Sequence, residues 1–389
     1  MKKILLGTTA IAAAALYAQS AQAQLTVSLG GYTEFFGAYY DDDVPGRTSR
    51  EFQLETEIVV RADGKADNGL LYGGKVELQN STSASSVETD EASVYLSGTW
   101  GRIELGDFDG AADTLAIYAP LVGIEQIDGD AYDFLDVTAS TGAATGTRFG
   151  AQPFFGLVKG PDSGDATKVM YLTPRFAGIQ AGVSYATQLG SEAQNVVSLK
   201  SATPGYKDFW EFGANYTGEF AGFSVAVGAT ASTASGEDRQ APPFSAVTTE
   251  LEDFFAWQAG AQIGYAGFKV GGGYIDGDDF GAVRGTTAGD ATAWHVGASY
   301  TAGPFAVGVT YADAEGAKGP SGGGALVGTT YASDYKTYGG GVAYTLAPGF
   351  VVQADLMYVD EEVQNITRAV PLTETNEGYV AVLSTRLNF

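Results

Sequence analysis

The sequence has no cysteine, one histidine and few basic residues, and each shortage excludes a class of protein. Without cysteine the chain can form neither a disulfide framework nor a thiolate metal site. Its 21 Lys and Arg residues are outnumbered by 46 Asp and Glu residues, which gives a formal net charge of −25 at pH 7. Because binding to phosphates requires a basic surface, nucleic acid is not an expected partner.

Long apolar runs are also missing. Beyond the N-terminal segment no stretch of about 18 consecutive apolar residues occurs, so the sequence predicts no transmembrane helix. Glycine (54), tyrosine (22) and phenylalanine (21) are abundant, which is typical of β structure. Two classes remain: a soluble β protein and a transmembrane β-barrel, whose strands alternate between apolar and polar residues.

Residues 1–23 have the features of a secretory signal peptide. Lysines at positions 2 and 3 precede an apolar run over residues 4–18, and residues 21–23 (Ala-Gln-Ala) match an A-x-A cleavage pattern. The alternative is an N-terminal membrane anchor, for which the run is short. We predict cleavage before Gln24, which leaves a single domain over residues 24–389. Its 19 basic and 46 acidic residues give a net charge of −27.

Residues 107–148 form the longest stretch without strand-like alternation. No basic residue precedes Arg148, and the apolar residues come in short clusters. Loops longer than about 12 to 15 residues are usually functional or disordered, and apolar clusters argue against disorder. We expect a loop that folds into the lumen of a barrel and narrows a water-filled hole; the alternative is a loop packed outward over the mouth. Its carboxylates belong to Asp107, Asp109, Asp113, Glu125, Asp128, Asp130, Asp133 and Asp136.

The rest of the chain alternates with the period of two that predicts β-strands. In residues 51–63, for example, Phe52 and Leu54 fall on one face and Gln53 and Glu55 on the other. Sixteen such segments follow one another, joined alternately by tight turns and long polar segments. An even count places both termini on the side of the short turns, as in bacterial outer-membrane barrels.

Aromatic residues flank the tight turns at 216–223, 265–268, 300–305 and 344–350. Rings at matched heights are favoured at a membrane interface, whereas the alternative is ordinary core aromatics beside turns. Between turns, we expect large apolar residues to point outward and small or polar residues to point inward. This pattern is the reverse of a packed globular core, and a sixteen-stranded barrel is wide enough for an aqueous channel.

These features resemble the general-diffusion porins of Gram-negative outer membranes, most of all the alphaproteobacterial type. The resemblance covers the whole mature chain and rests on the Ala-Gln-Ala site, residues 100–107 entering a long third loop, the hairpin at residues 171–178 and the terminal Phe389. It implies an all-β fold, a transmembrane 16-stranded antiparallel β-barrel with an inward-folded third loop. It also implies a homotrimer, with outer-membrane lipid and lipopolysaccharide as partners.

The resemblance further implies a row of basic wall residues that faces the carboxylates of the third loop. Family members commonly carry a tight arginine cluster at mid-height, whereas Glu55 and Glu57 stand at that level here. The inward basic residues are instead spread toward the short-turn side, which puts a strong transverse field in doubt. They are Arg61, Lys75, Arg102 and Arg386.

Catalytic and metal-binding chemistry has little support. An outer-membrane hydrolase would need His295 as a general base beside a serine nucleophile, but no serine-centred elbow motif occurs, so we expect no enzyme and read His295 as a polar lumen residue. Asp128, Asp130 and Asp133 are candidate ligands for a calcium ion, but they lack the spacing of an EF-hand loop. The alternative is a solvated acidic loop, although a bound cation would relieve the repulsion between these carboxylates.

We therefore expect a water-filled channel for passive diffusion of small hydrophilic solutes and ions, without a cofactor. Inward Glu34, Glu55, Glu57 and Glu77 outweigh the basic residues, so the channel should prefer cations, with Asp128, Asp130 and Asp133 as the main source. A channel selective for sugars or organic acids shares the fold and differs only in its lumen side chains. A secreted β-sandwich with a binding or adhesive role is the third alternative.

Overall fold

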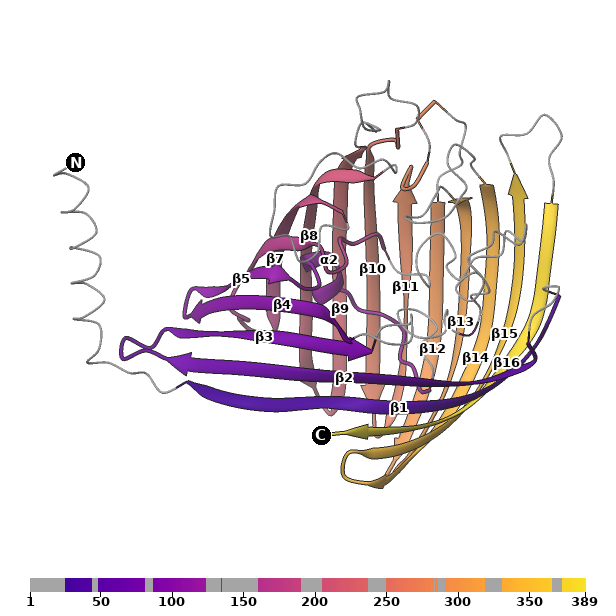
Figure 1. Cartoon of the computed structure of the whole chain (residues 1–389), viewed down its shortest axis with the longest axis horizontal. Coiled ribbons are helices and arrows are strands. Elements are labelled where there is room, and N and C mark those ends of the chain that lie inside the picture. Colours follow the sequence, from indigo (N-terminus) through magenta and orange to yellow (C-terminus); the bar gives the residue numbers. More distant parts are fainter. Residues whose placement is uncertain are drawn as a thin grey trace.

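The sixteen strands of the chain close into one antiparallel barrel (Figure 1). The computed structural model describes residues 25–43, 48–80, 87–123, 134, 160–189, 205–236, 250–282, 284–285, 291–318, 331–365 and 373–389. Within these ranges no helix has both the length and the apolar character needed to cross a membrane. The predicted signal peptide, residues 1–23, lies outside the described residues and stays a prediction.

The strands match the sixteen segments that alternation predicts. They are β1 (Thr26–Asp42), β2 (Arg50–Lys65), β3 (Leu71–Asn80), β4 (Val87–Gly98), β5 (Gly101–Asp107), β6 (Thr167–Leu172), β7 (Ile179–Gln188), β8 (Tyr206–Phe220), β9 (Phe223–Gly236), β10 (Phe254–Tyr265), β11 (Phe268–Asp278), β12 (Ala291–Ala302), β13 (Phe305–Lys318), β14 (Tyr331–Ala347), β15 (Phe350–Asn365) and β16 (Thr373–Asn388). A one-turn helix, α2 (Ala111–Thr114), follows β5.

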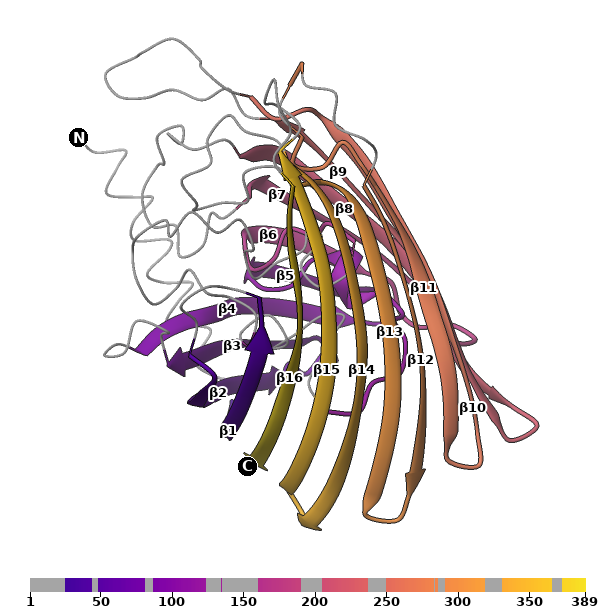
Figure 2. The same ribbon diagram turned by 90° about the vertical axis from the view of Figure 1, so that its right-hand side faces the viewer.

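Pairing of β1 with β16 closes the ring. Glu34 lies opposite Arg386 in this ladder, and the backbone N–H of Gly31 donates to the carbonyl of Phe389 at 3.1 Å while Phe389 returns a bond of 3.0 Å. Closure leaves no strand edge unpaired, and only closed sheets satisfy their backbone groups in hydrocarbon. Figure 2 shows the tight turns of the β10–β11, β12–β13 and β14–β15 hairpins at the same end of the barrel as the C terminus.

The outer face of the barrel is apolar. Phe52 is 77% exposed and Leu54 58% exposed on β2, whereas Gln53 and Glu55, between and beside them, face inward and are half-buried. The aromatic pairs predicted beside the tight turns are confirmed: Phe223–Tyr265, Phe268–Tyr300 and Phe305–Tyr344 have ring centroids 4.5, 4.3 and 4.6 Å apart. A second set of contacting rings crosses the other end of neighbouring strands, formed by Trp294, Tyr311, Tyr338, Tyr358 and Tyr379.

The inner face departs from the expectation that inward residues are small or polar. On β1 and β11–β16 the inward positions toward the long-loop end form a buried apolar cluster with Phe134, which includes Phe36, Tyr40, Met357, Val359, Val380 and Val382. The Phe134 side chain is fully buried, and its ring centroid lies 5.5 Å from that of Phe36. Apolar residues can face inward here because Phe134, which belongs to the long loop and not to a wall strand, covers them.

Candidate functional site

Residues 108–123, named here the inner strap, run from the end of β5 along the interior of the wall. The strap carries α2, which packs against β7, β8 and β9 (Figure 1). Side chains of the wall bind its backbone: the Ala111 N–H donates to Ser184 Oγ at 3.0 Å on β7, and the Leu115 carbonyl accepts from Asn215 Nδ2 at 3.2 Å on β8.

The same pattern continues along the strap. Gln262 Nε2 on β10 donates to the Tyr118 carbonyl at 2.7 Å, and the Ala119 N–H donates to His295 Nδ1 at 3.3 Å. His295 therefore faces the interior, as predicted, but its side chain is 2% exposed and is used to hold the strap. Accepting this bond requires an unprotonated Nδ1.

The chain returns from the loop to the same wall. The Gly160 N–H donates to Gln258 Oε1 at 3.1 Å, the Ser163 N–H donates to Glu211 Oε1 at 2.7 Å, and Ser232 Oγ donates to the Pro161 carbonyl at 2.6 Å.

A buried lysine joins the two limbs of the loop. Lys168 is 3% exposed, and its Nζ donates to the carbonyls of Phe108 and Gly164. Both limbs of the predicted third loop are therefore fixed to the interior of β6–β10. Residues 124–133 and 135–148 lie outside the described residues, so the inward course of that part stays a prediction.

The carboxylates predicted to line the constriction fall into three groups. Asp107 is 7% exposed at the end of β5 and accepts from Thr167 Oγ1 at 2.6 Å, so it belongs to the wall. Asp109 and Asp113 are half-buried in the strap, and Asp113 accepts from the Tyr118 hydroxyl at 3.0 Å. The remaining five lie outside the described residues; they are Glu125, Asp128, Asp130, Asp133 and Asp136. The calcium reading of Asp128, Asp130 and Asp133 therefore stays untested.

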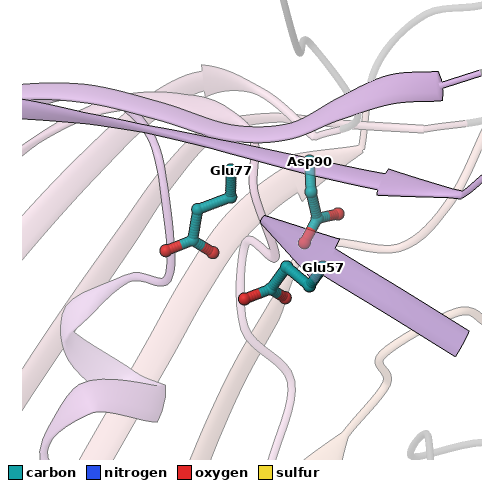
Figure 3. A group of neighbouring side chains, drawn as sticks. All are labelled: Glu57, Glu77 and Asp90. Atoms are coloured by element: carbon teal, nitrogen blue, oxygen red, sulfur yellow. The ribbon is translucent and has the colours of Figure 1, made fainter. Parts of the chain in front are cut away.

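A different carboxylate cluster lies on the wall opposite the strap. Glu57 of β2, Glu77 of β3 and Asp90 of β4 have carboxylate oxygens within 4.8 Å of one another (Figure 3). Alternation predicts that Glu57 and Glu77 face inward, but it misses Asp90. A register shift between Val76 and Leu78 in the β3–β4 ladder brings Asp90 beside them, and alternation cannot reveal a bulge.

The cluster lacks part of what a calcium site needs. Calcium takes about six to eight oxygen ligands, and carboxylates are the usual protein source. Three carboxylates supply only part of that set, and the Lys75 ammonium already pairs with Glu77 at 2.9 Å and with Glu91. We assign no metal to these residues.

The four predicted basic wall residues lie on β2, β3, β5 and β16. Lys75 is engaged as described above, and Arg61 lies opposite it in the β2–β3 ladder as an exposed residue. Arg102 pairs with Glu104 at 2.8 Å and its guanidinium lies 3.8 Å from the Tyr95 ring centroid.

The fourth basic residue repeats the arrangement of Arg102. Arg386 pairs with Glu34 at 3.1 Å and lies 3.7 Å from the Tyr32 ring centroid. Lys75, Arg102 and Arg386 thus each offset a carboxylate beside them, and in the described wall they do not gather into one positive patch.

Comparisons with known proteins agree with this architecture. Residues 7–364 match the family model described as Gram-negative porin. A mutant of the Rh. blastica porin has 17% sequence identity and a TM-score of 0.53, with 94% of this chain and 100% of that chain covered. A loop-deletion mutant of OmpT, an outer membrane protein of Vibrio cholerae, has 14% identity and a TM-score of 0.57, with 94% and 99% covered.

No curated protein matches the chain. At these identities the solved structures support the fold alone, whereas the family model spans most of the sequence. The chain belongs to the Gram-negative porin family.

Proposed function

We propose that the protein forms a water-filled channel in the outer membrane for passive diffusion of small hydrophilic solutes and ions. The observation that carries this proposal is the pairing of an apolar outer face with an inner wall on β2–β5 that carries clustered carboxylates. Such a wall has no counterpart in a soluble sandwich, whose inner faces pack together. The family consists of channel proteins, which also argues against an enzyme.

We propose in addition that the channel prefers cations. Glu57, Glu77 and Asp90 concentrate negative charge on one wall, while three of the predicted basic residues are already paired. Screening at physiological salt extends over about 8 Å, so carboxylates this close act together on a passing ion. The preference should therefore weaken as the salt concentration rises.

Single-channel conductance and reversal potential in a planar bilayer test both proposals. The wild-type protein should form open channels with a reversal potential on the cation side. Replacing the wall cluster by E57Q, E77Q and D90N together should shift this potential toward zero. The matched variant with D128N, D130N and D133N measures the share of the loop carboxylates. Anion preference in the wild type, or no shift in either triple variant, would remove the cation proposal.

Export and assembly belong to the same proposal. Residues 1–23 would be removed during export to the outer membrane, where lipid and lipopolysaccharide surround the barrel, and three copies would assemble into a homotrimer. Support for the trimer comes from the outer face of β1–β5. The ring contact there among the described residues is Phe35–Phe52, whereas a series of contacting rings, which lipid headgroups favour, crosses β12–β16. N-terminal sequencing and gel migration of the unheated protein test these two points: an intact Met1 contradicts export with cleavage, and migration only at monomer size contradicts the trimer.

A further inference from the structure

Seven glycines on seven wall strands lie under the inner strap. They are Gly182, Gly213, Gly228, Gly260, Gly297, Gly308 and Gly341, on β7, β8, β9, β10, β12, β13 and β14. Three pairs of them are direct cross-strand partners, namely Gly182 with Gly213, Gly228 with Gly260, and Gly308 with Gly341. Glycine is depleted in strands, and in a strand it often marks a close approach of another backbone.

The space that each missing side chain leaves is filled by the strap. A Cβ at Gly213 would lie 2.9 Å from the Ala111 carbonyl oxygen, and one at Gly297 would lie 2.7 Å from that of Pro120. At Gly260 the added carbon would overlap the carbonyl of Ile117. The strap therefore lies at backbone-to-backbone distance from the wall, which a wall residue with a side chain would prevent.

Polar side chains beside the glycines fix the strap along its length. Asn215 is the cross-strand partner of Gly228 in the β8–β9 ladder, and His295 is the partner of Gly273 in the β11–β12 ladder. A Cβ at Gly273 would lie 2.8 Å from His295 Nε2, so this glycine gives the imidazole the space from which it accepts the Ala119 N–H. The bonds from Asn215, Gln262 and His295 all go to backbone atoms of the strap.

We propose that this row of glycines sets the bore of the channel. Because these seven wall positions have no side chains, the strap lies close against β7–β14, and we infer that its distance from the opposite wall limits the open cross-section. The glycines are thus positioning residues for the strap, which acts as a fixed lining rather than a moving gate. The inference rests on the proposed channel function.

Gly260→Ala in the full-length protein gives the first test. The new methyl group would push the Ile117 carbonyl toward the pore axis by about 1 Å, because packed atoms transmit such strain rather than absorb it. We expect a loss of single-channel conductance, with unchanged β-sheet circular dichroism and unchanged migration of the unheated protein. Gly205→Ala is the control, since a Cβ there has no atom within 4 Å, and it should conduct like the wild type.

A size exchange at a second position separates a positioning role from general damage. A Cβ at Gly308 would lie 3.0 Å from both Cβ and Cγ2 of Val122, a milder overlap than at Gly260. Gly308→Ala should therefore reduce the conductance less than Gly260→Ala does. Adding Val122→Gly removes both contacting carbons and should restore the conductance of Gly308→Ala toward the wild-type value.

The outcomes are distinguishable. Wild-type protein that forms no channel contradicts the proposed function itself. Wild-type channels together with unchanged conductance in Gly260→Ala and Gly308→Ala overturn the role of the glycines. If Gly260→Ala does not fold, the Gly308→Ala protein and its rescue by Val122→Gly decide the question, and a reduced conductance without rescue also counts against the proposal.

Discussion

The inner walls on the two sides of the barrel carry different kinds of residue. On β7–β14 the inner wall has glycines that face the strap, and it carries amides and an imidazole that bind the backbone of the strap. On β2–β5 the inner wall carries carboxylates, and Lys75 and Arg102 pair with neighbouring acids. The strap covers one of these inner walls and a carboxylate cluster lies on the other, although the strands of both alternate with the same period.

The outer faces differ in a related way. Contacting aromatic rings cross β12–β16 in an unbroken series from Trp294 to Tyr379. Among the described residues of β1–β5, the aromatic contact on the outer face is Phe35–Phe52. Interfacial rings favour contact with lipid headgroups, so the two outer faces differ in a feature that lipid contact favours.

The largest effect should come from the point where the loop reaches the β1 wall. Phe134→Ala removes a fully buried ring from the cluster around Phe36 and Tyr40, and should lower the free energy of unfolding by about 3–5 kcal/mol. Urea unfolding in detergent micelles measures this. Phe176→Ala, at a ring that is 81% exposed in the β6–β7 turn, is the control and should change little. Equal losses in the two variants would contradict the burial of Phe134.

A smaller loss is expected at the base of the loop. Glu211 is 1% exposed and accepts hydrogen bonds from the Ser163 N–H and from Ser184 Oγ. Glu211→Gln turns one acceptor oxygen into a donor, which should cost about 1–3 kcal/mol in the same unfolding measurement. Glu219→Gln, at an exposed position on the same strand, serves as the control. A loss no larger than that of the control would show that the loop base does not depend on this carboxylate.

The outer belt predicts a still smaller effect and a difference between the two sides. Tyr338→Ala removes contacts to Tyr311 and Tyr358, whose ring centroids lie 4.8 and 6.0 Å away, and should cost about 0.5–1.5 kcal/mol without changing the gel migration of the unheated protein. Phe52→Ala on β2 should instead weaken the proposed trimer. Loss of the trimer in Tyr338→Ala but not in Phe52→Ala would reverse the assignment of the two faces.

The smallest effect separates the two inner walls by function. Gln262→Leu removes the donor to the Tyr118 carbonyl and should cost about 0.5–1 kcal/mol, with added current noise in the open channel because the strap is held less tightly. Gln79→Leu removes the donor to Asp90 at 2.7 Å on the other wall and should shift the reversal potential without added noise. The same change in both variants would mean that the two walls are not specialised.

The sequence predicts the barrel well because each strand carries its own signal. Residues 51–63 are predicted from alternation alone and lie within β2. Alternation states on which face a residue lies but not what meets it there. Gly260 and Gly308 are recognisable as inward residues, yet the strap that covers them is distant in the chain and has no periodic signal of its own.

Two further features could not be predicted from the sequence, each for a specific reason. Asp90 reaches the carboxylate cluster through a register shift, which displaces a residue without a change in composition. Phe36 and Val380 are apolar although they face the interior, which alternation alone does not explain. The explanation is that Phe134 covers this part of the wall. In both cases the missing information is a contact between segments far apart in the chain.

Pairing of β1 with β16 has a consequence for the order in which the barrel folds. Glu34 and Arg386 belong to the same ladder although almost the entire chain separates them, so this contact carries the largest loop-closure cost and forms late. Until it forms, the partly assembled sheet exposes two unpaired edges, and such edges readily join other chains. Closure therefore ends the aggregation-prone stage of folding, and changes that weaken the β1–β16 ladder should reduce the yield of refolding more than the stability of the barrel once it is closed.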